Sequence, residues 1–392
     1  MNSKRIKDRL IELGKIGQTV LGGTTRHSYT SLDLEACKLL ESWMIEAGLE
    51  VSYDAVGNLI GKKIGTNLSE KPIALGSHFD SVKEGGIYDG CLGIIGAIEI
   101  AEMLKQQTFD RTLIIIGFRD EEGYYSKGMV GSKAVAGILR GDDLYDTNEL
   151  GEVLQNKINE CGYHACDYEN CVLDLKAYLE CHIEQGRVLD ELNIPVGIVL
   201  GIVQLEMYKV KFIGQSGHAG ATPMSLRDDP VVIMSQWIES ITQKVKTYKD
   251  MVCTIGKIQT FPGSVNVICS EVEISLDIRS PYPNDIEEII TEFSSWNNVL
   301  LTPCVKLPGL LCHQKIIDSL KNSAHKLKVP YHLLFSGAGH DAMNFKNRCP
   351  VGMVFVRSIK GISHHKDELS LENDYRLALE VLLNTTKELL CS

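Results

Sequence analysis

The chain has 392 residues, 44% of them hydrophobic and 23% charged, which is the composition of a folded protein with about two or three domains. Its net charge of −11 argues against nucleic acid or an anionic membrane as the main partner. No apolar run approaches the ~18 residues of a membrane span, and the first residues are charged instead of forming a signal core, so the sequence predicts a cytoplasmic protein.

The N-terminal half alternates between helix-like and strand-like segments. Helices are predicted from Ser31, as N-cap, to Gly48 and from about residue 92 to 105, and strands at residues 58–64, 73–76 and 112–118. This βαβ order predicts an α/β domain with a mixed, largely parallel sheet. In such sheets ligands collect beyond the carboxyl ends of the strands. Three candidates follow apolar strand segments: His78, the pair Glu121-Glu122, and His182 after residues 177–179.

A cysteine series lies between these segments. Cys161, Cys166 and Cys171 recur every five residues with His164 among them. Known zinc spacings are tighter, so a second metal site is the minor alternative to scattered thiols on a surface connection. The twelve cysteines of this long chain are expected to be mostly reduced.

The pattern changes near Gln204. The segments that follow read as strand, helix, strand, strand, helix and strand, at residues 207–212, from 229, 253–258, 272–278, 285–295 and 300–306. This is the split βαβ, ferredoxin-like order of a compact α+β unit. We therefore predict an inserted domain at residues 204–308. Residues 1–203 and 309–392 would form a discontinuous catalytic domain, rejoined by a helix at about 315–327.

Five candidate metal ligands lie beside turn-forming residues in predicted loops at strand ends. Glycines on both sides of Asp89 let the backbone turn and bring its carboxylate toward His78. Asp80 lies two residues after His78, so its side chain points the same way and can accept the ring N–H as an outer partner. The five residue types suit two divalent metals a few ångströms apart. The candidates are His78, Asp89, Glu122, His182 and His364.

Two choices within this set rest on local chemistry. Adjacent side chains diverge, so Glu122 is assigned to metal and Glu121 to proton transfer as a general base. An isolated Glu-Glu pair is more often a solvated acidic turn, and an isolated histidine is more often structural. Chemistry alone does not distinguish His364 from His365.

The joint pattern resembles the dinuclear-metal amidohydrolases of the hydantoinase/carbamoylase family. These include N-carbamoyl-L-amino-acid hydrolases, β-ureidopropionase of the metal type and allantoate amidohydrolase, within the superfamily of aminoacylases and metal carboxypeptidases. The resemblance covers nearly the whole chain. Its motifs lie at residues 76–81, 85–90, 121–123, 182–186, 217–220, 277–279 and 337–341.

The resemblance implies roles for particular residues. One metal would be held by His78 and His182 and the other by Glu122 and His364, with Asp89 as the bridge. The two ions would be zinc, manganese, cobalt or nickel. The inserted domain would act as a lid and form a homodimer through its sheet edge and a helix.

The resemblance also implies a substrate site, with Gln185 and Gly339 among its contacts. Arg279 would hold the substrate carboxylate as a bidentate pair. His218, from the same subunit or its partner, would join Asn266 at the ureido oxygen and stabilise the charge that develops there. Without the resemblance, Arg279 reads as a surface ion pair, Asn266 as a turn residue and residues 217–220 as a mobile loop.

The expected reaction is hydrolysis of an N-carbamoyl-L-amino acid to the L-amino acid, carbon dioxide and ammonia. A metal-bridging water would lose its proton to Glu121, and the resulting hydroxide would attack the carbamoyl carbon. Allantoate or ureidoglycolate hydrolysis, cleavage of a true amide by a dipeptidase or aminoacylase, and non-catalytic metal or ligand binding are the alternatives. Three departures from the family pattern leave the substrate open: Arg187, Tyr124-Tyr125 and His365-Lys366.

Overall fold

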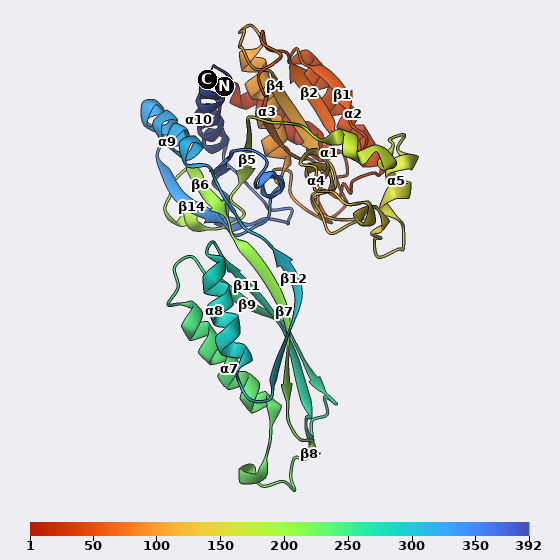
Figure 1. The fold of residues 1–392 in the computed structure, drawn as a ribbon, viewed down its shortest axis with the longest axis vertical. Helices are drawn as coiled ribbons and strands as arrows, with labels where there is room; N and C mark the ends of the chain where they lie inside the picture. The colour runs from red at the N-terminus through yellow and green to blue at the C-terminus, as the bar shows by residue number, and fades with distance from the viewer. Residues whose placement is uncertain (392) are drawn as a thin grey trace. The chain divides into compact units, whose positions relative to one another are not determined.

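The computed structural model describes residues 1–391 (Figure 1). The chain divides into an inserted unit, Gly201–Leu311, and a large unit built from Met1–Leu200 and the residues from Cys312 onward. The inserted domain expected at residues 204–308 lies within the inserted unit. No helix of the described residues is long and apolar enough to cross a membrane.

The large unit is built on one mixed sheet, with strand order β1-β2-β4-β3-β5-β15-β6 and with β14 also paired to β6. Its four central strands, β4-β3-β5-β15, are parallel, whereas β1, β2 and β6 pair antiparallel at the flanks. The parallel character is therefore confined to the centre. The strands are β1 (Glu50–Tyr53), β2 (Leu59–Lys63), β3 (Ile73–His78), β4 (Leu113–Phe118), β5 (Ala177–Ile183), β6 (Val196–Ile202), β14 (Tyr331–Ser336) and β15 (Val351–Val356), with the short β13 (Leu310–Leu311) paired to the end of β6.

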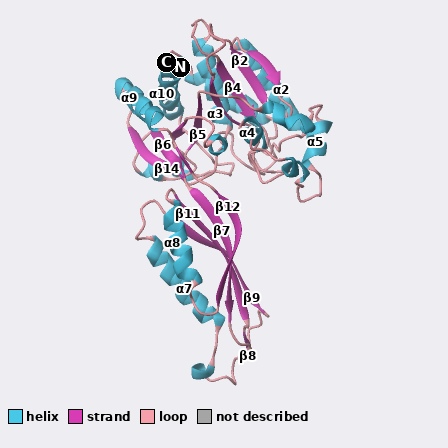
Figure 2. Cartoon of the chain, in the orientation of Figure 1, coloured by secondary structure: helices cyan, strands magenta, loops and turns pink. Residues whose placement is uncertain are grey.

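Helices cover this sheet (Figure 2). Every residue of β3, β4, β5 and β15 is buried, as expected for parallel strands with both faces covered. Helix α3 packs on β3 and β5, and α10 packs on β15 and α9. The N-cap of α2 is Thr30, one residue before the predicted Ser31. The helices are α1 (Ser3–Lys15), α2 (Ser31–Glu46), α3 (Cys91–Leu104), α4 (Val130–Val135), α5 (Leu154–Glu160), α6 (Val188–Glu191), α9 (Gln314–Leu327) and α10 (Glu372–Leu390).

The inserted unit is a four-stranded antiparallel sheet with two helices on one face (Figure 1). Alternate residues of β11 are buried, and they pack with Trp237 and Phe293 of the helices. Its chain order β7-α7-β9-β11-α8-β12 is the predicted split βαβ order, so the predicted fold class is confirmed in both units. The elements are β7 (Gln204–Ile213), α7 (Pro230–Val245), β9 (Val252–Phe261), β11 (Glu271–Ser280), α8 (Pro283–Ser294) and β12 (Val299–Leu307), with short strands β8 (Gly217–His218) and β10 (Val267–Ile268).

A buried ion pair anchors the loop that follows β4. The side chains of Arg119 and Asp33 are both fully buried and hydrogen-bonded to each other. Arg119 also donates to the main-chain oxygen of Gly57 at 2.7 Å and lies over the ring of Phe79. Because Arg119 directly precedes the segment that carries Glu121 and Glu122, this pair holds the start of that segment on the core.

We expect Asp33→Ala to lower the free energy of unfolding by about 3–5 kcal/mol, because it leaves the guanidinium of Arg119 buried without its counter-ion. Urea denaturation followed by circular dichroism measures the change. Asp174→Ala is the matched control: it removes the exposed partner of Lys71, which costs about 1 kcal/mol or less. Equal losses in the two variants would contradict the anchoring role of the buried pair.

Candidate metal centre

The four central strands of the large unit end at the same edge of the sheet, because they run parallel. His78 is the last residue of β3 and pairs in register with Phe118, the last residue of β4. His182 of β5 lies opposite Phe355, near the end of β15. The loops after β3, β4 and β15 carry the other candidates, Asp89, Glu121, Glu122 and His364.

Two histidine rings and one carboxylate converge at the ends of β3 and β5. The Nε2 atoms of His78 and His182 are 3.5 Å apart, and Asp89 Oδ1 lies 3.7 Å from the first and 3.2 Å from the second. In each ring Nδ1 faces a main-chain oxygen, at 3.2 Å for His78 and 3.0 Å for His182. Because that oxygen only accepts, Nδ1 carries the proton of the neutral ring and Nε2 directs its lone pair into the cluster.

The second oxygen of Asp89 belongs to another group. Asp89 Oδ2 is 3.1 Å from His364 Nε2. The same nitrogen of His364 is 3.8 Å from Glu122 Oε2. In this group, as in the group of His78, Asp89 and His182, the ligand atoms all lie within 4.8 Å of one another. One carboxylate therefore faces two candidate cation positions.

Burial gives this cluster a strong preference for added positive charge. Burial would raise the pKa of Asp89, but hydrogen bonds from three histidines hold it well below its ordinary value. Burial would likewise lower the pKa of His78, yet the neighbouring Glu121 and aspartates raise it well above its ordinary value. Burial, with Asp89 as a like charge nearby, raises the pKa of Glu122 to about 8. In the absence of a cation the cluster thus gains positive charge by binding protons.

The residues present fit divalent metal ions. Two imidazole lone pairs and several carboxylate oxygens converge within a few ångströms, and their mutual repulsion is strong in a buried site. Imidazole and carboxylate ligands suit zinc and other first-row divalent ions. Hydrolytic sites can hold two metal ions close together, and Asp89 is shared between two such groups. The donor set therefore fits divalent metal ions, with Asp89 common to both groups.

Glu121 lies beside the cluster but outside both groups built on Asp89. Its Oε2 is 3.8 Å from His78 Nε2, and its side chain is 10% exposed. Burial raises its pKa well above the ordinary value, with Glu122 adding to the rise and His78 opposing it. A carboxylate in this position can exchange a proton with a water molecule held at the cluster.

Asp80 connects the end of β3 to the loop after β4. Its Oδ1 lies 3.3 Å from His78 Nδ1, beside the main-chain oxygen that the ring also faces. Its Oδ2 accepts a hydrogen bond from the main-chain N–H of Glu122 at 3.2 Å. One carboxylate thus contacts the ring of one candidate ligand and the backbone of another.

Gln185 and Gly339 also lie beside the cluster. Gln185 Nε2 donates to Asp89 Oδ2 at 3.1 Å and lies 3.4 Å from His364 Nε2. Its Oε1 is buried without a hydrogen-bond partner among the described residues. Gly339 immediately precedes His340, whose ring packs edge-on against His182 with the ring centroids 4.4 Å apart.

Three of the predicted substrate residues belong to the inserted unit. His218 and Asn266 lie together, because β8 pairs with β10 and the N–H of Ala219 donates to the oxygen of Asn266 at 3.0 Å. His218 Nδ1 accepts the N–H groups of Gly220 and Ala221 at 3.1 and 3.2 Å. The exposed Nε2 of this ring therefore carries the proton and is a donor.

Arg279 lies near the end of β11, on the four-stranded sheet, whereas His218 lies on the separate two-stranded sheet of β8 and β10. Its guanidinium forms a two-point contact with Asp277, at 2.8 and 2.7 Å. At about 3.4 Å per residue, β11 covers roughly 27 Å between Glu271, where its neighbours lead to β10, and Arg279. His218 and Arg279 of one chain are therefore too far apart to contact the same small substrate.

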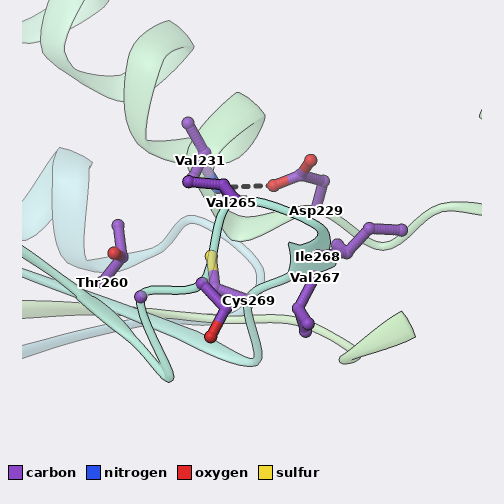
Figure 3. A pocket seen from close by; sticks show the side chains of 9 residues that line it. Asp229, Val231, Thr260, Val265, Val267, Ile268 and Cys269 are labelled. Carbon is purple, nitrogen blue, oxygen red and sulfur yellow. Dashed lines mark hydrogen bonds between the residues drawn. The ribbon is translucent and has the colours of Figure 1, made fainter. Parts of the chain in front are cut away.

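A shallow hollow of about 260 Å³ lies on the inserted unit (Figure 3). The neighbours of Asn266, Val265 and Val267, line it together with Asp229 and Cys269. The carboxylate of Asp229 accepts the N–H of Val231 at 3.0 Å and caps helix α7. That carboxylate has a structural role in the inserted unit.

Other sequence features have mainly local contacts. His365 is half-exposed, its ring lying 3.6 Å from the carboxylate of Asp367 and outside both groups on Asp89. The exposed Arg187 pairs with Glu191, and Tyr124 stacks on His27 with the ring centroids 3.8 Å apart. No group with metal-ligand spacing among the described residues contains Cys161, Cys166 or Cys171.

Sequence reasoning missed two buried acids beside the cluster. Glu180 lies two residues before His182 on β5, and it accepts hydrogen bonds from Ser77, Tyr178 and the N–H of Ala342. Glu368 accepts the main-chain N–H of Asp89 at 2.9 Å. The spacing of Glu180 and His182 on one strand was a usable signal. Nothing in the local sequence links Glu368 to a residue nearly three hundred positions earlier.

The chain belongs to the peptidase family M20/M25/M40, whose family model matches residues 74–388. Relatives of this chain include amidohydrolases of carbamoyl amino acids and of allantoate. It is 36% identical to the N-carbamoyl-L-amino acid amidohydrolase of Geobacillus stearothermophilus, over 99% of both chains. It is 32% identical to the allantoate amidohydrolase of Escherichia coli, over 93% of this chain and 92% of the relative.

A solved structure agrees with this assignment. The hydantoinase/carbamoylase family amidase of Burkholderia multivorans aligns with a TM-score of 0.92 and 27% identity, covering 100% of this chain and 98% of its own. The resemblance inferred from the motifs is thereby confirmed.

Substitution of His364 or of its neighbour His365 tests which of the two histidines is a metal ligand beside Asp89 Oδ2. We expect His364→Ala to lose one of two bound divalent ions, with a loss of affinity beyond the ~10–100-fold that removing an outer partner costs. His365→Ala should retain both ions, because its ring lies outside both groups on Asp89. Metal analysis after dialysis and titration with Mn²⁺ measures the stoichiometry, and loss of an ion in His365→Ala alone would reverse the assignment.

Proposed function

We propose that this protein is a metal-dependent amidohydrolase that cleaves the ureido C–N bond of N-carbamoyl-L-amino acids. The products are the L-amino acid, carbon dioxide and ammonia. The observation that carries the proposal is the cluster at Asp89, where two groups of ligand atoms share one carboxylate and Glu121 lies beside them. The names of the most similar relatives support the choice of a ureido substrate.

Five residues are proposed to hold two divalent ions. His78 and His182 would hold one ion, Glu122 and His364 the other, and Asp89 both. When bound, the ions supply a water acidified toward neutral pH and positive charge for the oxyanion of the transition state. Zinc, manganese, cobalt and nickel are all compatible with these ligands.

Glu121 is proposed to move the proton during hydrolysis. It accepts a proton from the attacking water and returns it to the leaving nitrogen of the substrate. Asp80 keeps the proton of His78 on Nδ1, so that Nε2 stays available to the cluster. Gln185 and Gly339 would contact the bound substrate from the large unit.

The inserted unit is proposed to supply the remaining substrate contacts. Arg279 binds the substrate carboxylate through two N–H groups. Asn266 and the Nε2–H of His218 donate to the ureido oxygen as it gains negative charge. Because the length of β11 separates His218 from Arg279 in one chain, we propose that His218 acts on the substrate of the partner subunit in a homodimer.

The surface of the inserted unit is compatible with such a dimer. Strand β9 is at the edge of the four-stranded sheet, and its Val252 and Ile258 are more than half exposed. Val232 of α7 is also exposed. An unpaired edge with apolar side chains is suited to pairing with its own copy. The resulting enzyme is proposed to act in the cytoplasm, where its cysteines stay reduced.

An ammonia-release assay of the metal-loaded protein tests the proposed substrate. The panel contains N-carbamoyl-L-amino acids, β-ureidopropionate, allantoate, ureidoglycolate and several dipeptides. We expect N-carbamoyl-L-amino acids to have the highest kcat/KM. Preference for allantoate or ureidoglycolate would move the protein to that branch of the family. Cleavage of dipeptides without ammonia would contradict ureido chemistry.

Glu121→Gln tests the assignment of the proton carrier. Gln is similar in size and neutral, so both ions should remain bound while kcat falls by at least ~10²–10⁴-fold. Steady-state kinetics together with metal analysis separates the two effects. Wild-type turnover in this variant would remove Glu121 from the mechanism, and loss of an ion would make it a ligand instead.

Mixing two inactive variants tests whether His218 acts across the dimer. In a mixed dimer of Glu121→Gln and His218→Ala, one of the two sites has both an intact Glu121 and an intact His218 from the partner. After subunit exchange at equal concentrations, roughly a quarter of the wild-type activity should return, since half of the dimers are mixed. No recovery despite mixed dimers in native mass spectrometry would place His218 in its own subunit's site.

A further inference from the structure

We propose that Glu368 is a positioning residue that ties the turn of Asp89 to the loop of His364 and thereby sets the affinity of one cation site. The site concerned is the group of Asp89, Glu122 and His364. This inference rests on the proposed metal-dependent function, but the hydrogen bonds that carry it are properties of the protein alone.

Glu368 is buried, with 5% of its surface exposed, and its carboxylate is directed at the turn of Asp89. Oε1 accepts two main-chain hydrogen bonds, from the N–H groups of Tyr88 and Asp89, each at 2.9 Å. Oε2 lies 3.4 Å from the hydroxyl of Ser363, which is also 3.4 Å from Asp89 Oδ2. One carboxylate thus holds the backbone that directs Asp89 and contacts the residue preceding His364.

The turn is shaped to receive this carboxylate. A Cβ added to Gly86 would lie 2.4 Å from Glu368 Oε1 and 2.5 Å from its Cβ, so any side chain at position 86 would displace Glu368. The main-chain N–H of Glu368 donates to the oxygen of His365 at 3.0 Å, which closes the turn that directly follows His364. The two loops therefore meet at one side chain.

The two candidate cation positions differ in how their ligands are supported. His78 and His182 lie on buried central strands, where the ladder of the sheet determines their separation. His364 lies in a loop with a positive φ of 55°, and its side chain is 51% exposed. Strand pairing does not fix the 3.1 Å distance between His364 Nε2 and Asp89 Oδ2. Gln185 Nε2 bridges Asp89 Oδ2 and the hydroxyl of Ser363, and Glu368 adds a restraint on the backbone of Asp89.

The test uses the full-length protein, freed of metal and titrated with Mn²⁺ alone. Wild type should bind two ions. Glu368→Ala should bind the second ion about 10–100-fold more weakly, as expected when an outer partner is lost. It should weaken the first ion by a clearly smaller factor, because His78 and His182 are held by the sheet. Glu368→Gln should bind both ions with affinities close to those of the wild type, because its amide oxygen still accepts both N–H groups. Electron paramagnetic resonance of free Mn²⁺ gives both affinities.

Asp367→Ala is the matched control, because Asp367 is an exposed acid in the same loop. It should leave both affinities unchanged. Gly86→Ala disturbs the same contact, because the added methyl group displaces the Glu368 side chain. It should weaken binding of the second ion as Glu368→Ala does. These two variants and Glu368→Gln keep the proposal testable if Glu368→Ala does not fold.

Several results would overturn the proposal. Wild-type affinities for both ions in Glu368→Ala or Gly86→Ala would do so, as would equal weakening of both ions. Loss of the second ion in Glu368→Gln would show that charge, not hydrogen-bond acceptance, matters. Hydrogen exchange of the metal-free protein provides a readout independent of metal: the amides of Tyr88 and Asp89 should exchange at least tenfold faster in Glu368→Ala.

The outcomes separate this inference from the proposed function. If wild type binds two ions and the variants behave as expected but no ureido substrate is cleaved, the proposed reaction fails and the positioning role stands. If wild type binds no Mn²⁺, the proposed metal site fails, and the exchange rates of Tyr88 and Asp89 still decide the role of Glu368.

Discussion

The position of one carboxylate, that of Asp89, determines the rest of the site. Its two oxygens face His182 at 3.2 Å and His364 at 3.1 Å, from segments that are far apart in the chain. Displacing Asp89 would separate both groups of ligand atoms at once, because it is the only residue common to the two groups on which the proposed ions depend. The glycine that follows Asp89 is part of this arrangement. Gly90 has a φ of 61°, and a Cβ there would lie 2.4 Å from the ring of His78.

The geometry of this carboxylate follows from the sheet. Parallel strands bring their carboxyl ends to one edge of the sheet. The residues that follow β3, β4, β5 and β15 are therefore neighbours because of the strand order. The register pairs His78 with Phe118 and His182 with Phe355, which places the segments that follow side by side. The buried pair of Arg119 and Asp33 then anchors the segment that carries Glu121. The sheet thus positions His78 and His182 directly, and it places the loops that carry the acidic residues beside them.

The sequence predicted the ligand types but not every contact that supports them. Residues such as His78 and Glu122 became candidates because ligands collect beyond the carboxyl ends of parallel strands, and the family resemblance chose His364 over His365. The fold class followed from hydrophobic periodicity and from the change of pattern near Gln204. Glu368 could not be found this way, because its role is defined by the main-chain N–H groups it accepts. Main-chain partners leave no trace in the identity of the residues at positions 88 and 89.

The separation of His218 from Arg279 is likewise a property of the folded chain that the residue types do not reveal. The family motifs imply substrate contacts for both residues, and nothing in the sequence says that the length of β11 separates them. Strand length decides it: β11 continues for ten residues between the turn near Asn266 and the end at Ser280. Two residues separated by a strand of this length cannot contact one small molecule. If both residues contact substrate, two copies of the chain must contribute to each site, so the homodimer becomes a requirement of the chemistry and not only of stability.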